Sequence, residues 1–289
     1  MENSQLQEVL RARLENSPPK ARRVVEFLLS HMREAAFLTI GDVAGELNVS
    51  KAQLVRVARM LGFGGYSELK AAIQETVLEQ VNPAAMLNRA LSENESALAA
   101  RIHQMEHANL EDTWNRLDPA NIKKFSAMLL AADSIFCAGW GISAMTSECL
   151  FSRLRELGLK SFTLQPGCLT LIEQVRCLDS RDVLIAFDLP SYALLLTESV
   201  ARAKQAGAKI ITVTDSPAAP ICKMADLSFF VSDSSPTFGS SLIGAVFLIH
   251  VLTSALSVEM GDRARKALEE QAACLHDERI YHPVFGLRY

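Results

Sequence analysis

The chain has 289 residues, of which 49% are hydrophobic and 21% charged, with a formal net charge of -4. This length allows two domains with real cores, and the charge excludes a wholly basic nucleic-acid coat but not a locally basic DNA-binding domain. No basic run followed by an apolar core opens the chain, so no secretory signal is expected. The six cysteines show no CxxC spacing, which predicts reduced thiols in the cytoplasm.

Residues 1–77 are predicted to form a small helical domain. After two prolines, apolar residues recur at helical spacing: Ala21, Val24, Leu28 and Met32. Two short helices follow, the first starting at the capping pattern Thr39–Asp42 and the second at Ser50–Gln53. Between them Asn48 suits the left-handed backbone of a tight turn, and Gly62 is expected to end the second helix.

The second of these helices, Lys51–Leu61, is amphipathic. At about 100° per residue, its apolar residues share one face and its amide and guanidinium side chains lie on the opposite arc. Glutamine can pair with adenine and arginine with guanine in the major groove, and both lysine and arginine bind phosphates. A helix, a tight turn and a capped second helix predict a helix-turn-helix. An ordinary three-helix unit with a solvated polar face is the alternative.

The same residues resemble a known family. The run Leu38–Ala44, the turn Leu47–Ser50 and the stretch LGFGGYSELK at Leu61–Lys70 look like the N-terminal domain of RpiR-type bacterial regulators, which couple a helix-turn-helix to a sugar isomerase (SIS) domain. The resemblance implies that a polar set contacts DNA: Ser50, Lys51, Gln53, Arg56 and Arg59, with Tyr66 and Lys70 holding the DNA backbone. We therefore expect salt-sensitive binding of a dimer to a palindromic operator in double-stranded DNA.

Residues 119–265 alternate between apolar runs and helical patterns. Strands are predicted at Ser134–Ala138, Ser161–Leu164, Val183–Phe187, Lys209–Val213 and Leu227–Val231. The fold class is therefore α+β multidomain, an all-α helix-turn-helix domain followed by a doubly wound α/β domain with a five-stranded parallel sheet. Residues 78–118 are expected to be a helical linker that packs on a partner subunit or on its own domain, and residues 266–289 a C-terminal tail. The apolar segment Leu242–Val258 is expected to be a buried core helix and not a membrane span.

The α/β domain resembles an SIS domain from about Pro119 to Arg265. That family has a GxGxS loop after the first strand, and Gly139, Gly141 and Ser143 match it. A GxGxxA turn also suggests a dinucleotide site, but such a site expects an acidic residue after the second strand, and the stretch Thr163–Gly167 has none. No cofactor, metal or catalytic residue is therefore predicted.

The third strand departs from the SIS pattern. The family has a Ser-x-Ser-Gly-x-Thr phosphate cradle there, whereas this chain has Phe187–Tyr192, in which Asp188 would repel a phosphate. Isomerase activity is therefore disfavoured, and the effector is either a sugar phosphate or a neutral or amine-bearing ligand paired with Asp188. Effector residues are expected on loops at the carboxyl ends of strands, although hydroxyl residues there can equally be turn and cap residues. They are Gly139, Trp140, Gly141, Ser143, Asp188, Ser191, Tyr192, Thr214, Ser232 and Ser234.

Together these patterns predict a cytoplasmic transcription regulator, a homodimer or homotetramer with no membrane partner, whose SIS-like domain senses a small metabolite and modulates operator binding. The alternative is an SIS-type sugar phosphate isomerase or binding enzyme with an accessory helical domain. The lost phosphate cradle favours the regulator.

Overall fold

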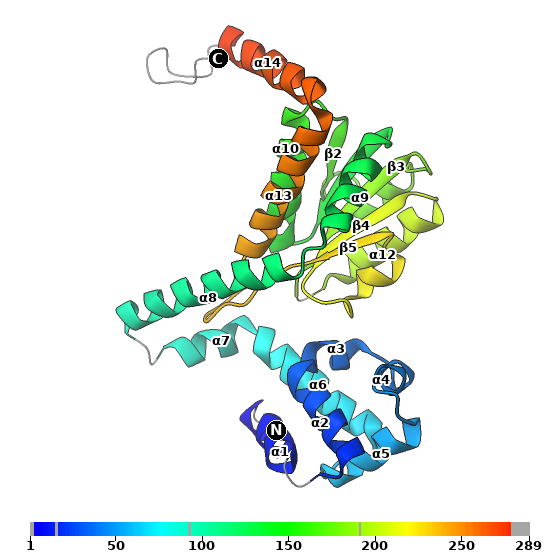
Figure 1. The fold of residues 1–289 in the computed structure, drawn as a ribbon, viewed down its shortest axis with the longest axis vertical. Coiled ribbons are helices and arrows are strands. Elements are labelled where there is room, and N and C mark those ends of the chain that lie inside the picture. Colours follow the sequence, from blue (N-terminus) through cyan, green and yellow to red (C-terminus); the bar gives the residue numbers. More distant parts are fainter. Residues whose placement is uncertain (1–2, 15–16, 92–93, 191, 279–289) are drawn as a thin grey trace. The chain divides into compact units, whose positions relative to one another are not determined.

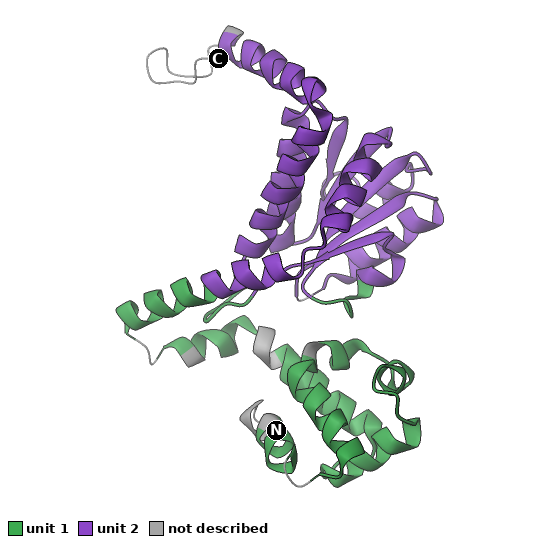
Figure 2. Cartoon of the chain, viewed as in Figure 1, with its two compact units in different colours: residues 1–106, 216–220, 234–240 green, residues 107–215, 221–233, 241–289 purple. Residues whose placement is uncertain are grey.

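The computed structural model describes residues 3–14, 17–91, 94–190 and 192–278. The chain forms two compact units (Figures 1 and 2). Unit 1 comprises residues 1–106, 216–220 and 234–240, and unit 2 comprises residues 107–215, 221–233 and 241–289. One helix, α8 (Glu95–Asn115), contains residues of both units.

Unit 1 is helical. Its elements before α8 are α1 (Asn3–Leu14), α2 (Pro19–Ser30), α3 (Met32–Phe37), α4 (Ile40–Glu46), α5 (Lys51–Met60), α6 (Tyr66–Val81) and α7 (Pro83–Ala90). The apolar stripe predicted from the sequence is buried, but the structure divides it, with Ala21, Val24 and Leu28 on α2 and Met32 at the start of α3. The helices α5 and α6 contribute Leu54, Leu69 and Ile73 to the same core. Leu6 and Leu10 of α1 complete that core, and α1 was not expected from the sequence.

Local capping fixes the turn between α4 and α5. Thr39 and Asp42 form the predicted capping box, and the Ser50 hydroxyl accepts a hydrogen bond from the Gln53 amide. Asn48 adopts a φ of 50°, and Gly62, after α5, adopts a φ of 97°. The predicted left-handed turn and helix end are therefore confirmed, and they set α5 as the second helix of a helix-turn-helix.

Unit 2 contains a parallel sheet of five strands in the order β2-β1-β3-β4-β5, which confirms the predicted fold class. The strands are β1 (Ser134–Gly139), β2 (Ser161–Leu164), β3 (Asp182–Phe187), β4 (Lys209–Thr214) and β5 (Leu227–Phe230). The helices are α9 (Pro119–Leu130), α10 (Ile142–Glu156), α11 (Leu171–Val175), α12 (Leu194–Gln205), the short 3₁₀ helix η1 (Pro220–Met224), α13 (Ile243–Met260) and α14 (Asp262–Asp277).

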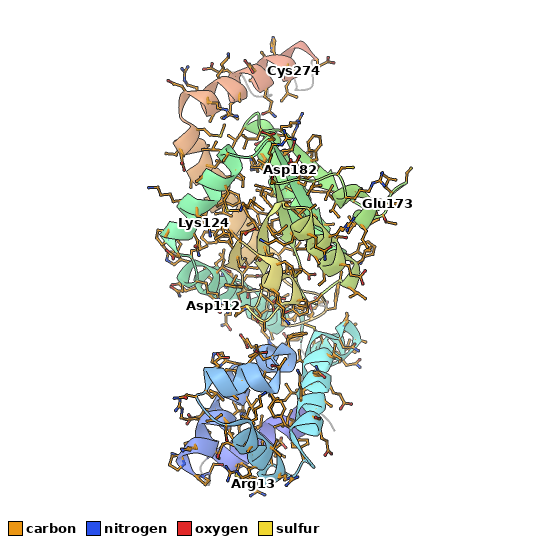
Figure 3. The ribbon with its side chains drawn as sticks, turned by 90° about the vertical axis from the view of Figure 1, so that its right-hand side faces the viewer. Arg13, Asp112, Lys124, Glu173, Asp182 and Cys274 are labelled. Atoms are coloured by element: carbon orange, nitrogen blue, oxygen red, sulfur yellow. The ribbon has the colours of Figure 1, made fainter. Side chains whose placement is uncertain are left out.

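Helices cover both faces of the sheet, because successive strand residues point to opposite sides. Val183, Ile185 and Phe187 of β3 belong to the core under α9, α10 and α13, whereas Leu184 and Ala186 belong to the core under α11 and α12. The edge strand β5 is tied to both layers through the residue before it. Lys124 of α9, labelled in Figure 3, donates to the Asp226 carbonyl, and Lys204 of α12 pairs with the Asp226 carboxylate.

The apolar helix α13 is the predicted core helix. By length and composition alone it could cross a membrane. In the fold one side of α13 packs into the core beneath the sheet through Ala245, Leu248, Ile249, Leu252 and Leu256. Burial within unit 2 therefore accounts for the apolar residues on that side of α13, whereas Val246 and Val258 are exposed.

Candidate functional sites

The polar face of α5 is presented to solvent in unit 1. Leu54, Val57 and Ala58 are buried against the other helices, and this packing turns the opposite arc outward. On that arc the side chains of Lys51, Arg56 and Arg59 are exposed, and Gln53 is half-buried. The helix therefore offers three cations and an amide on one accessible surface.

Short-range hydrogen bonds order this surface. The guanidinium of Arg56 donates from Nη2 to the Gln53 Oε1 at 3.2 Å, so the two predicted base-reading groups form one connected pair. Arg59 donates from Nε to the Gly64 carbonyl at 3.4 Å, which directs it toward the loop that follows α5. Ser50 acts as the N-cap of the helix.

Tyr66 and Lys70 of α6 have a different placement from the rest of the predicted DNA-contacting set. Tyr66 is 7% exposed and lies in the core of unit 1, where burial and then the charge of Asp42 raise the pKa of its phenol. The Lys70 ammonium donates to the Leu38 carbonyl at 2.6 Å and so binds α6 to the end of α3. Their placement favours structural roles in unit 1.

The turn after β1 requires its glycines. A Cβ on Gly139 would lie 2.3 Å from the Ser143 carbonyl oxygen, and Gly141 adopts a φ of 57°. Trp140 between them is exposed. Ser143 is buried, and its hydroxyl accepts a hydrogen bond from the Leu189 amide at 3.2 Å, so it joins this turn to the loop after β3.

The loop after β3 contains a buried carboxyl group. Asp188 is 2% exposed, and its Oδ1 accepts the Ala193 amide at 3.1 Å, next to the start of α12. Its Oδ2 is buried without a hydrogen-bond partner. Burial raises the pKa of Asp188 to about 7, and the nearby charge of Asp215 acts in the same direction.

Asp215, directly after β4, joins this group, although it is absent from the residues expected from the sequence. The Tyr192 hydroxyl donates to Asp215 Oδ1 at 2.7 Å, and Thr214 donates from Oγ1 to the Asp188 carbonyl at 2.7 Å. Arg116 donates from Nη1 to the Asp215 carbonyl at 3.1 Å. The loops after β3 and β4 therefore form one hydrogen-bonded group, and the signal for Asp215 was its place next to Thr214 at a strand end. Ser191 lies outside the described residues.

The loop after β5 is bound to α8. Ser232 donates from its amide to Thr113 Oγ1 and from its hydroxyl to Asn109 Oδ1, both at 3.0 Å. Asn109 and Thr113 are buried, whereas Asp112, which lies between them in the sequence and is labelled in Figure 3, is exposed. Ser234 is exposed and belongs to unit 1. The sequence had offered no reason to pair α8 with this loop.

Known protein families match both units. Residues 4–80 match the helix-turn-helix domain of the rpiR family, and residues 128–258 match the SIS domain. An uncharacterized HTH-type transcriptional regulator of Clostridium perfringens is 23% identical over 91% of this chain and 98% of its own length. The HTH-type transcriptional regulator RpiR of Escherichia coli is 26% identical over 75% of this chain and 73% of its own length. The chain therefore combines a helix-turn-helix domain of the rpiR family with an SIS domain.

Solved structures agree on the fold. The sugar isomerase domain of an RpiR transcription factor from Sphaerobacter thermophilus covers 60% of this chain at 24% identity, with 97% of that chain aligned and a TM-score of 0.58. The Vibrio vulnificus NanR protein, solved in complex with ManNAc-6P, covers 94% of this chain at 21% identity, with 98% of that chain aligned and a TM-score of 0.62.

Proposed function

We propose that this protein controls transcription by binding an operator through α5, and that a small metabolite bound at the carboxyl edge of the sheet in unit 2 modulates that binding. The observation that carries the proposal is the division of α5 into a buried apolar face and an exposed face with Gln53, Arg56 and Arg59. Such a face can enter the major groove while the helix stays anchored in its domain.

The metabolite is proposed to bind among the loops after β1, β3 and β4, because open parallel sheets bind ligands at the carboxyl ends of their strands. The turn at Gly139 and Gly141, together with Asp188, Tyr192 and Thr214, supplies the polar groups there. The NanR neighbour, solved in complex with ManNAc-6P, suggests a sugar phosphate or a related compound, but Asp188 in the loop where SIS domains carry the phosphate cradle opposes a phosphate in this chain. The loss of the phosphate cradle after β3 favours sensing over isomerisation, so no catalytic role is proposed.

We also propose that the regulator works in the cytoplasm as a homo-oligomer. A palindromic operator needs two helix-turn-helix domains related by a two-fold axis, with their reading helices one turn of DNA apart. A single copy of α5 contacts one half-site only. Size measurement of the purified protein by light scattering, with and without its operator, tests the oligomeric state.

The test of DNA recognition uses duplexes selected by the purified protein from a random library. Arg56→Ala is expected to lower affinity for the selected duplex by about 10-fold to 100-fold if Arg56 reads a base, or to reduce the salt slope by about 1 if it binds a phosphate. Lys266→Ala, which removes an exposed cation of α14 in unit 2, is the matched control and should leave both quantities unchanged. Unchanged affinity and salt dependence in Arg56→Ala would contradict α5 as the reading helix.

A further inference from the structure

Two buried carboxyl groups lie together at the carboxyl edge of the sheet in unit 2. Asp188 follows β3 and Asp215 follows β4, and both are buried. Their carboxylates are close enough for the charge of Asp215 to act on Asp188. Arg116 donates to the backbone carbonyl of Asp215. A site with this charge balance favours a cationic ligand.

Asp188 lies at the N-terminus of α12, where the free backbone amides of a helix usually attract an anion. Its Oδ1 accepts the Ala193 amide at the start of α12, so the chain supplies its own anionic group there. In the SIS pattern the loop after this strand carries the phosphate cradle. A ligand phosphate at this amide would displace Asp188 or lie against its carboxylate, and Coulomb repulsion opposes that arrangement in a partly dry site.

The second carboxyl oxygen of Asp188 lacks a hydrogen-bond donor. Oδ2 is buried without a hydrogen-bond partner, and a buried acceptor without a donor costs free energy. An ammonium group carries three N–H donors and a positive charge, so it can satisfy Oδ2 and offset both carboxylates. Among the described residues, no cluster of three His, Cys, Asp or Glu side chains could hold a metal ion, which favours an organic cation over a metal.

We propose that the effector of this protein is a small primary amine, whose ammonium group is bound by Asp188 and Asp215, and that the site excludes phosphate from the start of α12. The proposal rests on the proposed effector site and names the chemistry of its ligand. It distinguishes this chain from an SIS domain that holds a phosphosugar through a serine cradle.

The test uses methylammonium chloride as the probe and the full-length protein at pH 8, above the native pKa of about 7 of Asp188, so that its carboxyl group is ionised. The Ala193 amide donates to Asp188, so its NMR signal reports on the carboxylate directly. Methylammonium is expected to shift this signal in a saturable manner. Tetramethylammonium, which has the same charge but no N–H donor, should shift it little. Asp188→Asn, which keeps an acceptor for Ala193, should weaken the methylammonium response at least tenfold.

A matched variant on the same strand controls for general charge effects. Asp182, labelled in Figure 3, lies at the opposite end of β3, where its carboxylate accepts the Asp179 amide. Asp182→Asn should therefore retain the wild-type response. The Leu189 amide, which donates to Ser143, should keep its position in Asp182→Asn and so report that the loop remains folded.

Sodium phosphate provides the reciprocal test. In the wild-type protein phosphate should leave the Ala193 signal unchanged, whereas in Asp188→Ser, which replaces the carboxyl group with a hydroxyl, it should shift that signal. A phosphate response in the wild-type protein, an absent methylammonium response, or an unchanged response in Asp188→Asn would each overturn the proposal.

Binding to the selected duplex is measured on the same preparations. The measurements therefore test the role in transcription and the amine effector independently of each other. Intact duplex binding without an ammonium response overturns the amine proposal alone. An ammonium response in a protein that selects no duplex supports the amine site and contradicts the role in transcription.

Discussion

Replacing Asp188 with asparagine should change how the stability of unit 2 depends on pH. The native carboxyl has a pKa of about 7, raised from its ordinary value of 3.8 chiefly by burial. Between these two values the folded state binds a proton that the unfolded state does not, so stability falls as pH rises and the loss is complete once the pH exceeds the native pKa. The asparagine side chain of the variant would accept the same amide hydrogen bond without titrating.

The size of the effect follows from the two pKa values. For one group that titrates at about 7 when folded and near 3.8 when unfolded, stability falls by about 2.5 kcal/mol between pH 5 and pH 8. The full penalty of ionising the buried carboxyl, compared with strongly acidic solution, is about 4 kcal/mol at 1.36 kcal/mol for each pKa unit. The variant should lack this decline, so its stability relative to wild type should increase with pH.

Urea denaturation followed by tryptophan fluorescence measures this difference. The chain has two tryptophans, Trp114 and Trp140, and both belong to unit 2, so their fluorescence reports on that unit. Free energies of unfolding would be compared between wild type and Asp188→Asn at pH 5 and pH 8. Equal pH slopes for the two proteins would show that Asp188 is ionised when folded and would refute the assignment of a raised pKa.

Asp226→Asn is the matched control. Burial opposes ionisation of Asp226, but hydrogen bonds from Lys204 and from the Ile210 amide outweigh it and lower its pKa. Its stabilising contribution is therefore present above the unfolded pKa and is lost only as pH falls through the native value. This variant should be less stable at both pH 5 and pH 8, with the wild-type slope retained.

Other perturbations test the local geometry. Gly139→Ala should destabilise unit 2, since its Cβ would lie 2.3 Å from a backbone oxygen, whereas Gly167→Ala, with nothing within 4 Å, should be close to neutral in the same urea assay. Leu54→Ala should cost unit 1 about 2–5 kcal/mol of unfolding free energy, measured by circular dichroism, because Leu54 is fully buried. Ser50→Ala should cost about 1 kcal/mol through the lost N-cap of α5, and no change in stability would contradict that capping role.

The parts of the fold that the sequence predicted correctly depend on short-range patterns. The strands were placed within a residue or two because apolar runs alternate with helical spacing in an α/β domain. The turn between α4 and α5 was predicted because capping side chains and a left-handed asparagine act within a few residues of one another. Such signals are readable along a single stretch of chain.

The sequence contains a pattern that predicts the burial of Tyr66, and the interpretation above did not use it. With Leu69, Ile73 and Val77, Tyr66 forms an apolar stripe at helical spacing on α6, and all of these residues are buried. The family resemblance implied that Tyr66 holds the DNA backbone, whereas this stripe predicts that Tyr66 lies in the core. Lys70 could not be predicted in this way, since its partner Leu38 is distant in sequence and only the packed fold brings them together.

The effector site depended even more on long-range contacts. Asp188, Tyr192 and Asp215 come together because parallel strands end at the same edge of the sheet, and this much follows from the strand assignments. The bonds that bind Ser232 to Asn109 and Thr113 span more than a hundred residues, and no local pattern specifies them. Hydroxyl residues at strand ends were therefore predictable as a group, but their partners were not.

These partners suggest how the proposed ligand site acts on the rest of the protein. Thr113 binds the loop after β5, and Arg116, just beyond α8, binds the loop after β4 that carries Asp215. Residues 95–106 of α8 belong to unit 1 and residues 107–115 to unit 2. A ligand that changes the hydrogen bonds of Asp215 therefore acts on the loop that Arg116 binds, and it can regulate the protein only if it binds two states of the protein with different affinity.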